Sequence, residues 1–331
     1  MRILVIGGTQ FMGLQAVQRL VADGHKATVF HRGNRCDALP DAVEHLHGDA
    51  NELSQFAGEI RRFRPDAVLD MVLERGSDAA ELVKALSGST RKLVAASSVN
   101  VYLGYSLLHR LETAEPEDRV HTEAGPLRTH RFRESDSHDE KIEVEQAVMD
   151  AVSLDPAVIR LSAVHGPNDP QHRGYEWLWR MDAGRQQMVL NDIVGRWKWA
   201  RGYVDNMVDA LLLAMFDDRA AGKIYNVSDP VTMTQAEWVE ALGRAAGWEG
   251  RVISTHLRPG PTDTDRRHHL VVDSSLIREE LGYTESVATD EWIRRTVEWL
   301  RANPPSPEEA AKTRSAGLTF EEEDRIVRKL G

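Results

Sequence analysis

The sequence is poor in the features that would assign it to several specialised classes of protein. It has one cysteine, Cys36, among 331 residues, so no disulfide can form within the chain. No apolar run reaches the roughly 20 residues that a membrane-spanning helix needs, and the first residues resemble a strand rather than a leader peptide. The formal net charge of −11 argues against nonspecific binding to nucleic acid or anionic membranes. We therefore expect a cytoplasmic protein whose partner is a small molecule.

Grouped metal ligands are scarce as well. His268 and His269 are adjacent, so their side chains project apart, and no acidic or cysteine residues accompany them at ligand spacing. Cys36 has no neighbours that would activate a thiol. We expect no metal site and no cysteine nucleophile.

The most informative motif is a glycine-rich turn, GGTQFMG, at positions 7–13. It follows an apolar run over 1–6 and precedes a helical pattern over 11–23. Such a turn binds phosphate because glycines let the backbone approach the anion and because the first N–H groups of the helix point at it. Gln10 takes the middle position of G-x-x-G-x-x-G, where a glycine would be expected. We predict that this loop binds a dinucleotide through Gly7, Thr9, Gln10, Phe11, Met12 and Gly13.

Strands and helices alternate through the first half of the chain. Further strands are predicted over 26–30, 43–46, 67–72, 92–96 and 157–161, and helices near 14–22, 52–63, 78–87 and 138–153. This order predicts an α/β fold with a Rossmann-type, doubly wound parallel sheet, whose ligands lie at the carboxyl ends of the strands. The long polar segment 103–139 is either a surface loop or a lid over the site.

The second half is irregular at first and rich in tryptophan. Helical patterns return near 205–217, 234–246, 274–281 and 289–301, and two charged helical stretches follow Pro304-Pro305. We predict a dinucleotide-binding domain over 1–167 to which 200–228 returns. A smaller, interleaved substrate lobe with a helical tail would comprise 168–199 and 229–331.

Several other motifs occur in a fixed order along the chain. They are Gly48-Asp49, DAVLDMV at 66–72, AASSVNVY at 95–102, Lys141-x-x-x-Glu145, VIRLSAVHGP at 158–167 and RGYVDNMVDALLLA at 201–214. With them, nearly the whole chain resembles the extended short-chain dehydrogenase/reductase family, also called the NAD-dependent epimerase/dehydratase family. The GGTxFxG form of the loop resembles an atypical branch that includes reductases and chloroplast stem-loop RNA-binding proteins.

The end of the second predicted strand bears on the choice of coenzyme. An acidic residue there would bind the ribose 2′-OH and favour NAD, but this chain has His31-Arg32. Arg32 can bind a 2′-phosphate through two parallel hydrogen bonds, which favours NADP over NAD. The alternative is an ordinary surface arginine. The resemblance implies further coenzyme contacts at Asp49, Ala50, Met71, Val72, Lys141, Leu161 and Ala163. Asp49 could equally cap a helix.

Family chemistry requires a tyrosine that transfers a proton, a lysine four residues later that lowers its pKa, and a serine that holds the substrate oxygen. Ser98 matches the serine and Lys141 the lysine, although a backbone-bonded hydroxyl and a solvated lysine are the alternatives. Ser137 stands in place of the tyrosine, and a serine hydroxyl does not titrate near neutral pH without a base. Glu145, at i+4 from Lys141, suggests an ion pair along the helix.

Three explanations of the missing tyrosine remain open. Another residue could supply the proton, with Tyr102, Tyr105 and His138 nearest in sequence, although Tyr102 also matches a structural tyrosine of the family. The substrate's own acidity could suffice, or catalysis could have been lost.

Candidate substrate contacts are Ser98, His165, Arg201 and Arg258. The resemblance places His165 near the coenzyme, in place of a common family tyrosine, with a structural histidine as the alternative. Arg201 is a candidate anion ligand, and Arg258 begins a loop over 258–269 whose arginines could hold a phosphate. Asp205 is a plausible N-cap of the helix that follows.

These patterns predict an NAD(P)-dependent oxidoreductase or epimerase/dehydratase that acts on a hydroxyl or carbonyl of a polar, sugar-like small molecule. The alternative is a non-catalytic NAD(P)-binding protein, either a redox sensor or an RNA-binding protein, although the acidic charge disfavours RNA. Homodimers are common in the family, but no residue pattern here argues independently for one.

Overall fold

The structure is a computed structural model that describes residues 1–33, 37–131, 140–315 and 317–330. Cys36, Ser137 and His138 lie outside these ranges.

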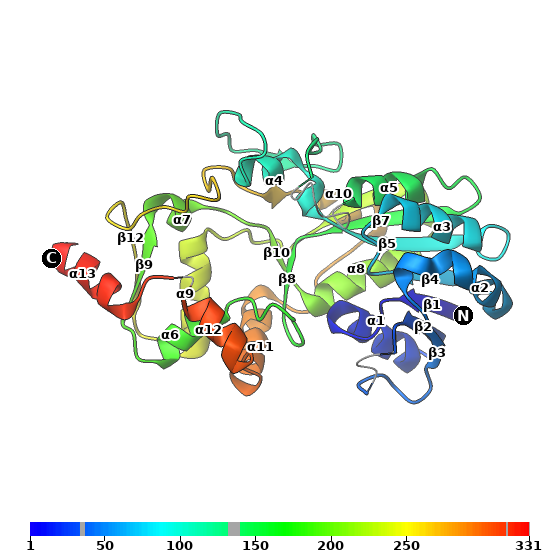
Figure 1. The fold of residues 1–331 in the computed structure, drawn as a ribbon, viewed down its shortest axis with the longest axis horizontal. Coiled ribbons are helices and arrows are strands. Elements are labelled where there is room, and N and C mark those ends of the chain that lie inside the picture. The colour runs from blue at the N-terminus through cyan, green and yellow to red at the C-terminus, as the bar shows by residue number, and fades with distance from the viewer. Residues whose placement is uncertain (34–36, 132–139, 316, 331) are drawn as a thin grey trace.

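A seven-stranded parallel sheet occupies one side of the molecule (Figure 1). Its strands are β1 (Arg2–Ile6), β2 (Lys26–His31), β3 (Glu44–His47), β4 (Ala67–Asp70), β5 (Lys92–Ser98), β7 (Asp155–Leu161) and β11 (Lys223–Val227). They pair in the order β3-β2-β1-β4-β5-β7-β11, so the chain winds outward in both directions from the β1–β4 pair. The predicted Rossmann-type, doubly wound sheet is confirmed, and β11 adds a strand that the sequence patterns did not mark.

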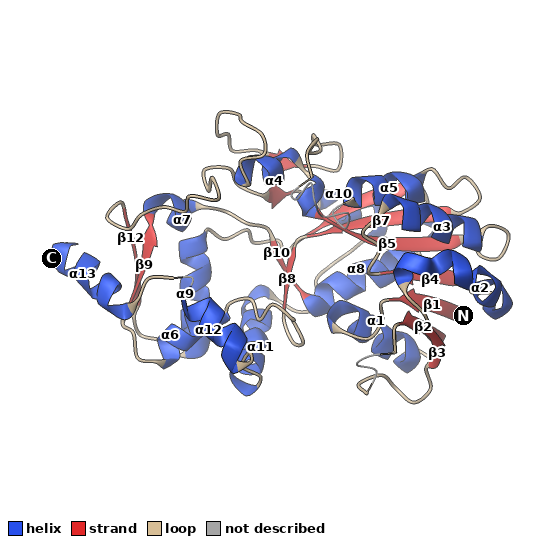
Figure 2. Cartoon of the chain, in the orientation of Figure 1, coloured by secondary structure: helices blue, strands red, loops and turns tan. Residues whose placement is uncertain are grey.

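Helices cover both faces of the sheet (Figure 2). Alternate residues of a strand point to opposite faces, so Ile3 and Val5 of β1 pack in one core and Leu4 and Ile6 in another. The first core includes side chains of α1 (Phe11–Ala22) and α8 (Val204–Phe216). The second includes side chains of α2 (Ala57–Phe63), α3 (Gly76–Leu86) and α5 (Lys141–Met149).

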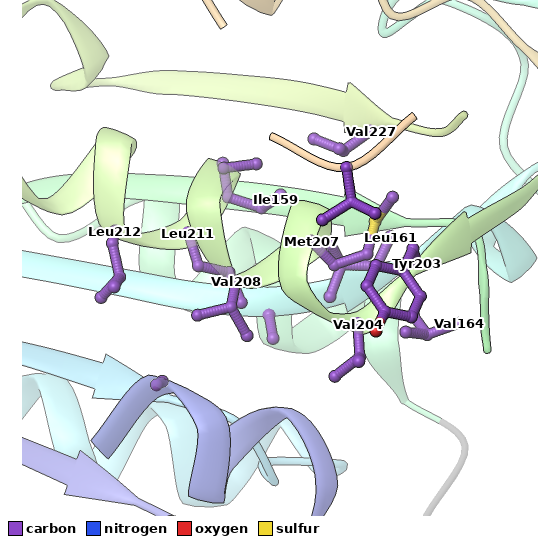
Figure 3. Close-up of a cluster of buried hydrophobic side chains, with 14 of the residues drawn as sticks. Ile159, Leu161, Val164, Tyr203, Val204, Met207, Val208, Leu211, Leu212 and Val227 are labelled. Atoms are coloured by element: carbon purple, nitrogen blue, oxygen red, sulfur yellow. The ribbon is translucent and has the colours of Figure 1, made fainter. Parts of the chain in front are cut away.

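Helix α8 is apolar on most of its surface because several elements surround it. Figure 3 shows part of this core, where Ile159 and Leu161 of β7 lie near Met207, Val208 and Leu211 of α8. Burying each such side chain contributes about 1.5–3 kcal/mol. The helix is therefore firmly held beside the carboxyl end of β7.

A smaller lobe lies at the other side of the molecule, beyond the paired strands β8 (Ala163–His165) and β10 (Arg201–Tyr203) (Figure 1). Its own two-stranded sheet joins β9 (Gln187–Asn191) and β12 (Arg251–Thr255). The other helices of the second half are α6 (Tyr175–Asp182), α7 (Asp192–Arg196), α9 (Gln235–Ala246), α10 (Ser275–Leu281), α11 (Thr289–Ala302), α12 (Pro307–Ser315) and α13 (Phe320–Leu330). Of these, α10 packs against β11 of the large sheet.

The described part of segment 103–139 is more ordered than the predicted loop or lid. It contains α4 (Leu103–Leu108) and the two-residue strand β6 (Val120–His121), which pairs with β13 (Val271–Val272). The backbone also returns to the fold, because Arg128 N donates to Val101 O at 2.8 Å. The expectation of a plain loop is therefore wrong for 103–108 and 120–121. No helix among the described residues is long and apolar enough to cross a membrane.

Candidate functional site

A cavity of about 570 Å³ opens at the carboxyl ends of β1, β2 and β4. Its walls come from the glycine loop, the end of β2, the turn after β3 and the turn after β4. The lining residues are Gly7, Thr9, Gln10, Phe11, Met12, Gly13, Phe30, His31, Arg32, Gly48, Asp49, Ala50, Asn51, Met71, Val72 and Glu74. The structure thus brings together most of the side chains that the sequence assigned to a coenzyme.

Backbone geometry explains the glycines of the loop. Gly7 has φ +85°, in the left-handed region that favours glycine. A Cβ on Gly13 would lie 2.2 Å from Gly7 O, so α1 can start this close to β1 only without a side chain there. No acidic residue occupies the first turn of α1, and no side chain caps it. Its first N–H groups therefore form an electropositive wall suited to phosphate. Gln10, the departure from the glycine pattern, is extended and exposed.

Two predicted contacts line the cavity where β2 and β3 end. Arg32 is exposed and follows the last residue of β2. The Asp49 carboxylate accepts the Asn51 N–H at 2.9 Å and caps the 3₁₀ helix η1 (Ala50–Phe56). Asp49 thus has the capping role expected as its alternative, and it also borders the cavity.

Asp70, which the sequence patterns did not mark, shapes one wall of the cavity without lining it. It ends β4, is fully buried, and accepts the N–H groups of Val72 at 3.0 Å and Leu73 at 3.1 Å. These bonds shape the turn that brings Val72 against the glycine loop, where a Cβ on Gly7 would lie 2.1 Å from Val72 Cγ1. Burial raises the pKa of Asp70, and the charge of Lys141 opposes this. A carboxylate ending an apolar strand was the signal available in the sequence.

Three predicted residues, Ser98, Lys141 and Leu161, lie near the carboxyl ends of β4, β5 and β7. Lys141, the first residue of α5, donates to Leu73 O at 2.5 Å and to Ala96 O at 3.4 Å. Ser98 Oγ accepts the Asn100 N–H at 3.2 Å, and Ser98 pairs in register with Leu161. Lys141 therefore bonds to the strand-end turn that also contributes Val72 to the cavity. Leu161 and Ala163 are buried and do not line the cavity.

Tyr102 and Glu145 belong to a buried polar network. The Tyr102 hydroxyl donates to Asn226 Oδ1 at 2.7 Å and accepts from Arg160 at 2.9 Å. Arg160 also pairs with Glu145, which in turn accepts the Ser97 hydroxyl. The predicted ion pair between Glu145 and Lys141 is therefore wrong, because Glu145 faces the strands. Burial raises the pKa of Tyr102, which has the structural role given as its alternative. The ring of Tyr105, on α4, lies 4.4 Å from that of His109.

His165 and Arg201 lie where the two halves of the molecule meet. His165 is buried at the end of β8, and its ring stands edge-on to Trp238 at 5.0 Å. Burial, with Arg201 and Arg173 nearby, keeps the pKa of His165 well below its usual value, so the ring is neutral. Arg201 is also buried and donates to Gln235 Oε1 at 2.8 Å. Burial lowers the pKa of Arg201 to about 9.

The structure separates Arg258 from the other candidates. It follows β12, donates to the backbone of Val189 and lies near Glu323 of α13. Both β12 and α13 lie at the far end of the smaller lobe (Figure 1). In the same loop, Arg266 stacks on Trp197 and Arg267 pairs with Asp265. The predicted phosphate-binding role of this loop is therefore not supported by its contacts.

Asp205 does not cap α8, whose N-cap is Tyr203. Instead Asp205 accepts from Gln15 at 2.5 Å and so joins α8 to α1. Among the described residues, no group of three or more His, Cys, Asp or Glu side chains is arranged to hold a metal ion.

Known proteins resemble this chain in sequence and in fold. Residues 3–228 match the model of the NAD dependent epimerase/dehydratase family. The chain is 25% identical over 280 residues to chloroplast stem-loop binding protein of 41 kDa b from Arabidopsis thaliana, covering 80% of this chain and 68% of that protein. It is 26% identical over 261 residues to 2′-dehydrokanamycin reductase from Streptomyces kanamyceticus, covering 75% and 67%.

A solved structure shares the fold. dTDP-glucose 4,6-dehydratase from Bacillus anthracis, solved in complex with NAD, matches with a TM-score of 0.71 and 16% identity, covering 92% of this chain and 97% of that one.

Proposed function

The chain belongs to the NAD-dependent epimerase/dehydratase family, and from that premise we propose that it is an NADP-preferring oxidoreductase, epimerase or dehydratase of the family's atypical branch. Its substrate would be a polar, sugar-like small molecule that reacts at a hydroxyl or carbonyl. The reductase and dehydratase relatives support nicotinamide-dependent chemistry of this kind.

The observation that carries the proposal is the cavity around the glycine loop. Gly7 and Gly13 leave no room for a Cβ, and the first turn of α1 presents N–H groups without a capping side chain. These features fit the diphosphate of a dinucleotide. When bound, a nicotinamide coenzyme supplies or accepts the hydride.

Side chains at the strand ends fit the other steps. The Lys141 ammonium has three N–H donors, and two of them bond to backbone carbonyls. The third N–H would then donate to a ribose hydroxyl of the coenzyme. Ser98 Oγ accepts a backbone N–H and keeps its own proton to donate to a substrate oxygen. Ser98 would therefore orient the substrate and Lys141 the coenzyme. Buried Arg201 would favour the anionic part of a substrate such as a nucleotide sugar.

Arg32 tests the preference for NADP. Its exposed guanidinium lines the cavity at the end of β2, where an acidic residue would favour NAD. We expect Arg32→Ala to weaken NADP binding by about ten- to a hundredfold, because a charge-assisted bond is worth about 1.5–3 kcal/mol. NAD binding should hardly change. Titration of each coenzyme by calorimetry measures both, and Arg62→Ala, an exposed arginine on α2, is the matched control. Equal losses for the two coenzymes would refute the assignment.

A second candidate function is coenzyme binding without catalysis, either as a redox sensor or in RNA binding. It is favoured by the polar network that holds Tyr102, and by Ser137 at the position of the family tyrosine. Incubation with NADPH and a panel of nucleotide sugars and sugar ketones separates the candidates. Oxidation of NADPH, or conversion of a sugar, supports the enzyme. Binding of NADPH without conversion, together with RNA binding that weakens steeply with salt, supports the alternative.

A further inference from the structure

Three histidines gather beside the end of β2. His31 lies opposite His47 in the parallel register, and Val29 lies opposite His45, so all three imidazoles fall on the same face of β2 and β3. The ring centroid of His31 lies 5.0 Å from that of His45 and 4.7 Å from that of His47. His31 is buried, whereas His45 and His47 are exposed. We call these residues the histidine cluster.

The hydrogen bonds of the cluster assign the state of His31. Gly33 N donates to His31 Nδ1 at 3.0 Å, so this nitrogen carries no proton. His31 Nε2 then carries the proton and donates to His45 Nδ1 at 2.8 Å. The bonded pair is therefore neutral. A second proton on His31 would replace the acceptor of the Gly33 N–H with a donor, and a second proton on His45 would place two donors face to face.

The surroundings of the cluster favour an incoming anion. His31 and Arg32 line the cavity, and His47 directly precedes the lining residue Gly48. The carboxylates nearest in sequence to His45 and His47 have other partners, because Glu44 pairs with Lys26 at 2.6 Å and Asp49 caps η1. Among the residues that the structure describes, no carboxylate pairs with any of the three imidazoles. The cluster therefore lacks the counter-ion that would charge it in the free protein.

We propose that the histidine cluster and Arg32 form a proton-linked subsite for the coenzyme 2′-phosphate, so that binding of NADP takes up protons and binding of NAD does not. This rests on the proposed function, because it assumes that the cavity holds the adenosine end of a nicotinamide coenzyme. A 2′-phosphate brings nearly two negative charges close to neutral imidazoles. An opposite charge nearby favours the charged form of a histidine, so the protons enter from solvent as the phosphate binds.

Two features make this more than a surface group of histidines. Burial, with His47 and His45 as neighbours, lowers the pKa of His31, so the free protein has protons to gain at neutral pH. Both ring nitrogens of His31 are engaged, to Gly33 and to His45, so His31 offers no lone pair to a metal ion. Protonation of His31 Nδ1 would also break the bond from the Gly33 N–H.

Calorimetry tests the proposal. NADP and NAD are each titrated into the protein at about pH 7.5, where the 2′-phosphate is almost fully dianionic because its second pKa is about 6. Repeating each titration in PIPES and in Tris, which differ in ionisation enthalpy, gives the number of protons taken up. We expect more protons per NADP than per NAD. NADP affinity should fall by about three- to tenfold per pH unit as pH rises above 7, and NAD affinity should stay level.

The variants His45→Gln, His47→Gln and the double variant locate the effect. Both residues are exposed, so their replacement removes little packing. We expect the double variant to take up fewer additional protons with NADP and to show a weaker pH dependence of NADP binding, because only His31 of the cluster remains, while His256→Gln, an exposed histidine in the smaller lobe, keeps both in full. Equal proton uptake for the two coenzymes, or an unchanged double variant, overturns this inference and leaves the proposed function standing. If neither coenzyme binds, both fail.

Discussion

The two ends of the proposed coenzyme site are built in different ways. At the glycine-loop end, the cavity is lined by exposed backbone and by side chains that face it, such as Arg32. At the end where we propose that the chemistry occurs, called the reactive end below, the polar side chains are bonded to other parts of the protein; they are Ser98, Lys141, Tyr102, His165 and Arg201. Nucleotide binding therefore depends on backbone shape, which a short motif specifies. The chemistry depends on side chains whose partners come from distant segments.

The largest expected effect concerns the reactive end. Glu145 is buried and holds Arg160, so Glu145→Ala leaves an unpaired buried cation and should cost about 3–5 kcal/mol of unfolding free energy. Urea unfolding measures it. Glu143→Ala, two residues earlier on α5 and paired with Arg131 at the surface, should cost less than about 1 kcal/mol. Similar losses in the two variants would contradict a structural role specific to this pair.

The next effect concerns the glycine-loop end. Gly13→Ala would place a Cβ 2.2 Å from a backbone oxygen, and neither helix nor strand can move away without opening the loop. We expect coenzyme affinity to fall about a hundredfold or more, which corresponds to about 2.7 kcal/mol. Gly58→Ala on α2 is the control, because nothing lies within 4 Å of its added Cβ. If Gly13→Ala binds the coenzyme as well as Gly58→Ala does, the loop is not the diphosphate site.

The glycine-loop end could largely be predicted from the sequence. The pattern around Gly7 and Gly13 is local, and the hydrophobic runs gave the strands of the first half within about two residues. Strand ends in a parallel sheet meet at one edge, so Arg32, Asp49 and Val72 could be placed together before the structure was known.

The remaining features depend on pairing that one sequence does not display. The histidine cluster needs the register that sets His31 opposite His47. Glu145 has a lysine four residues before it, but its partner Arg160 comes from a neighbouring strand. Arg258 looked suitable for a phosphate because its loop is rich in arginine, yet it bonds to the backbone of Val189 and lies near Glu323. Local rules assign local partners, whereas the histidine cluster, Glu145 and Arg258 have partners that are distant in sequence.

Lys141 connects the two ends and should give an intermediate effect. If its ammonium reaches the coenzyme ribose, Lys141→Met removes one charge-assisted bond and should weaken binding of either coenzyme about tenfold. Lys84→Met, on the exposed side of α3, is the matched control and should bind normally. Fluorescence titration with NADPH and NADH measures both. Unchanged affinity in Lys141→Met would place the lysine entirely in the structural network of the reactive end.

The smallest expected effect is a dependence of stability on pH that arises beside Tyr102. His121 is buried and stacks on the Tyr102 ring at 4.8 Å. Burial, assisted by Arg119, lowers the pKa of His121 to about 4, whereas the unfolded chain titrates near its ordinary value of about 6.5. Between these values the unfolded chain binds a proton that the folded one excludes. Stability is therefore full above about pH 6.5 and falls with decreasing pH until it levels near pH 4.

From pH 7.5 to 5.5, this one group should lower the unfolding free energy by about 1 kcal/mol. Urea unfolding of His121→Asn at both pH values tests this, because the pH difference within each protein is independent of any cost of the substitution itself. Buried His165 also has a lowered pKa, so part of the acid sensitivity should remain in the variant. His256→Asn, at an exposed position of the smaller lobe, is the control. An equal reduction in both variants would mean that acid acts on the whole fold, and the contrast between a buried reactive end and an open glycine-loop end would not hold.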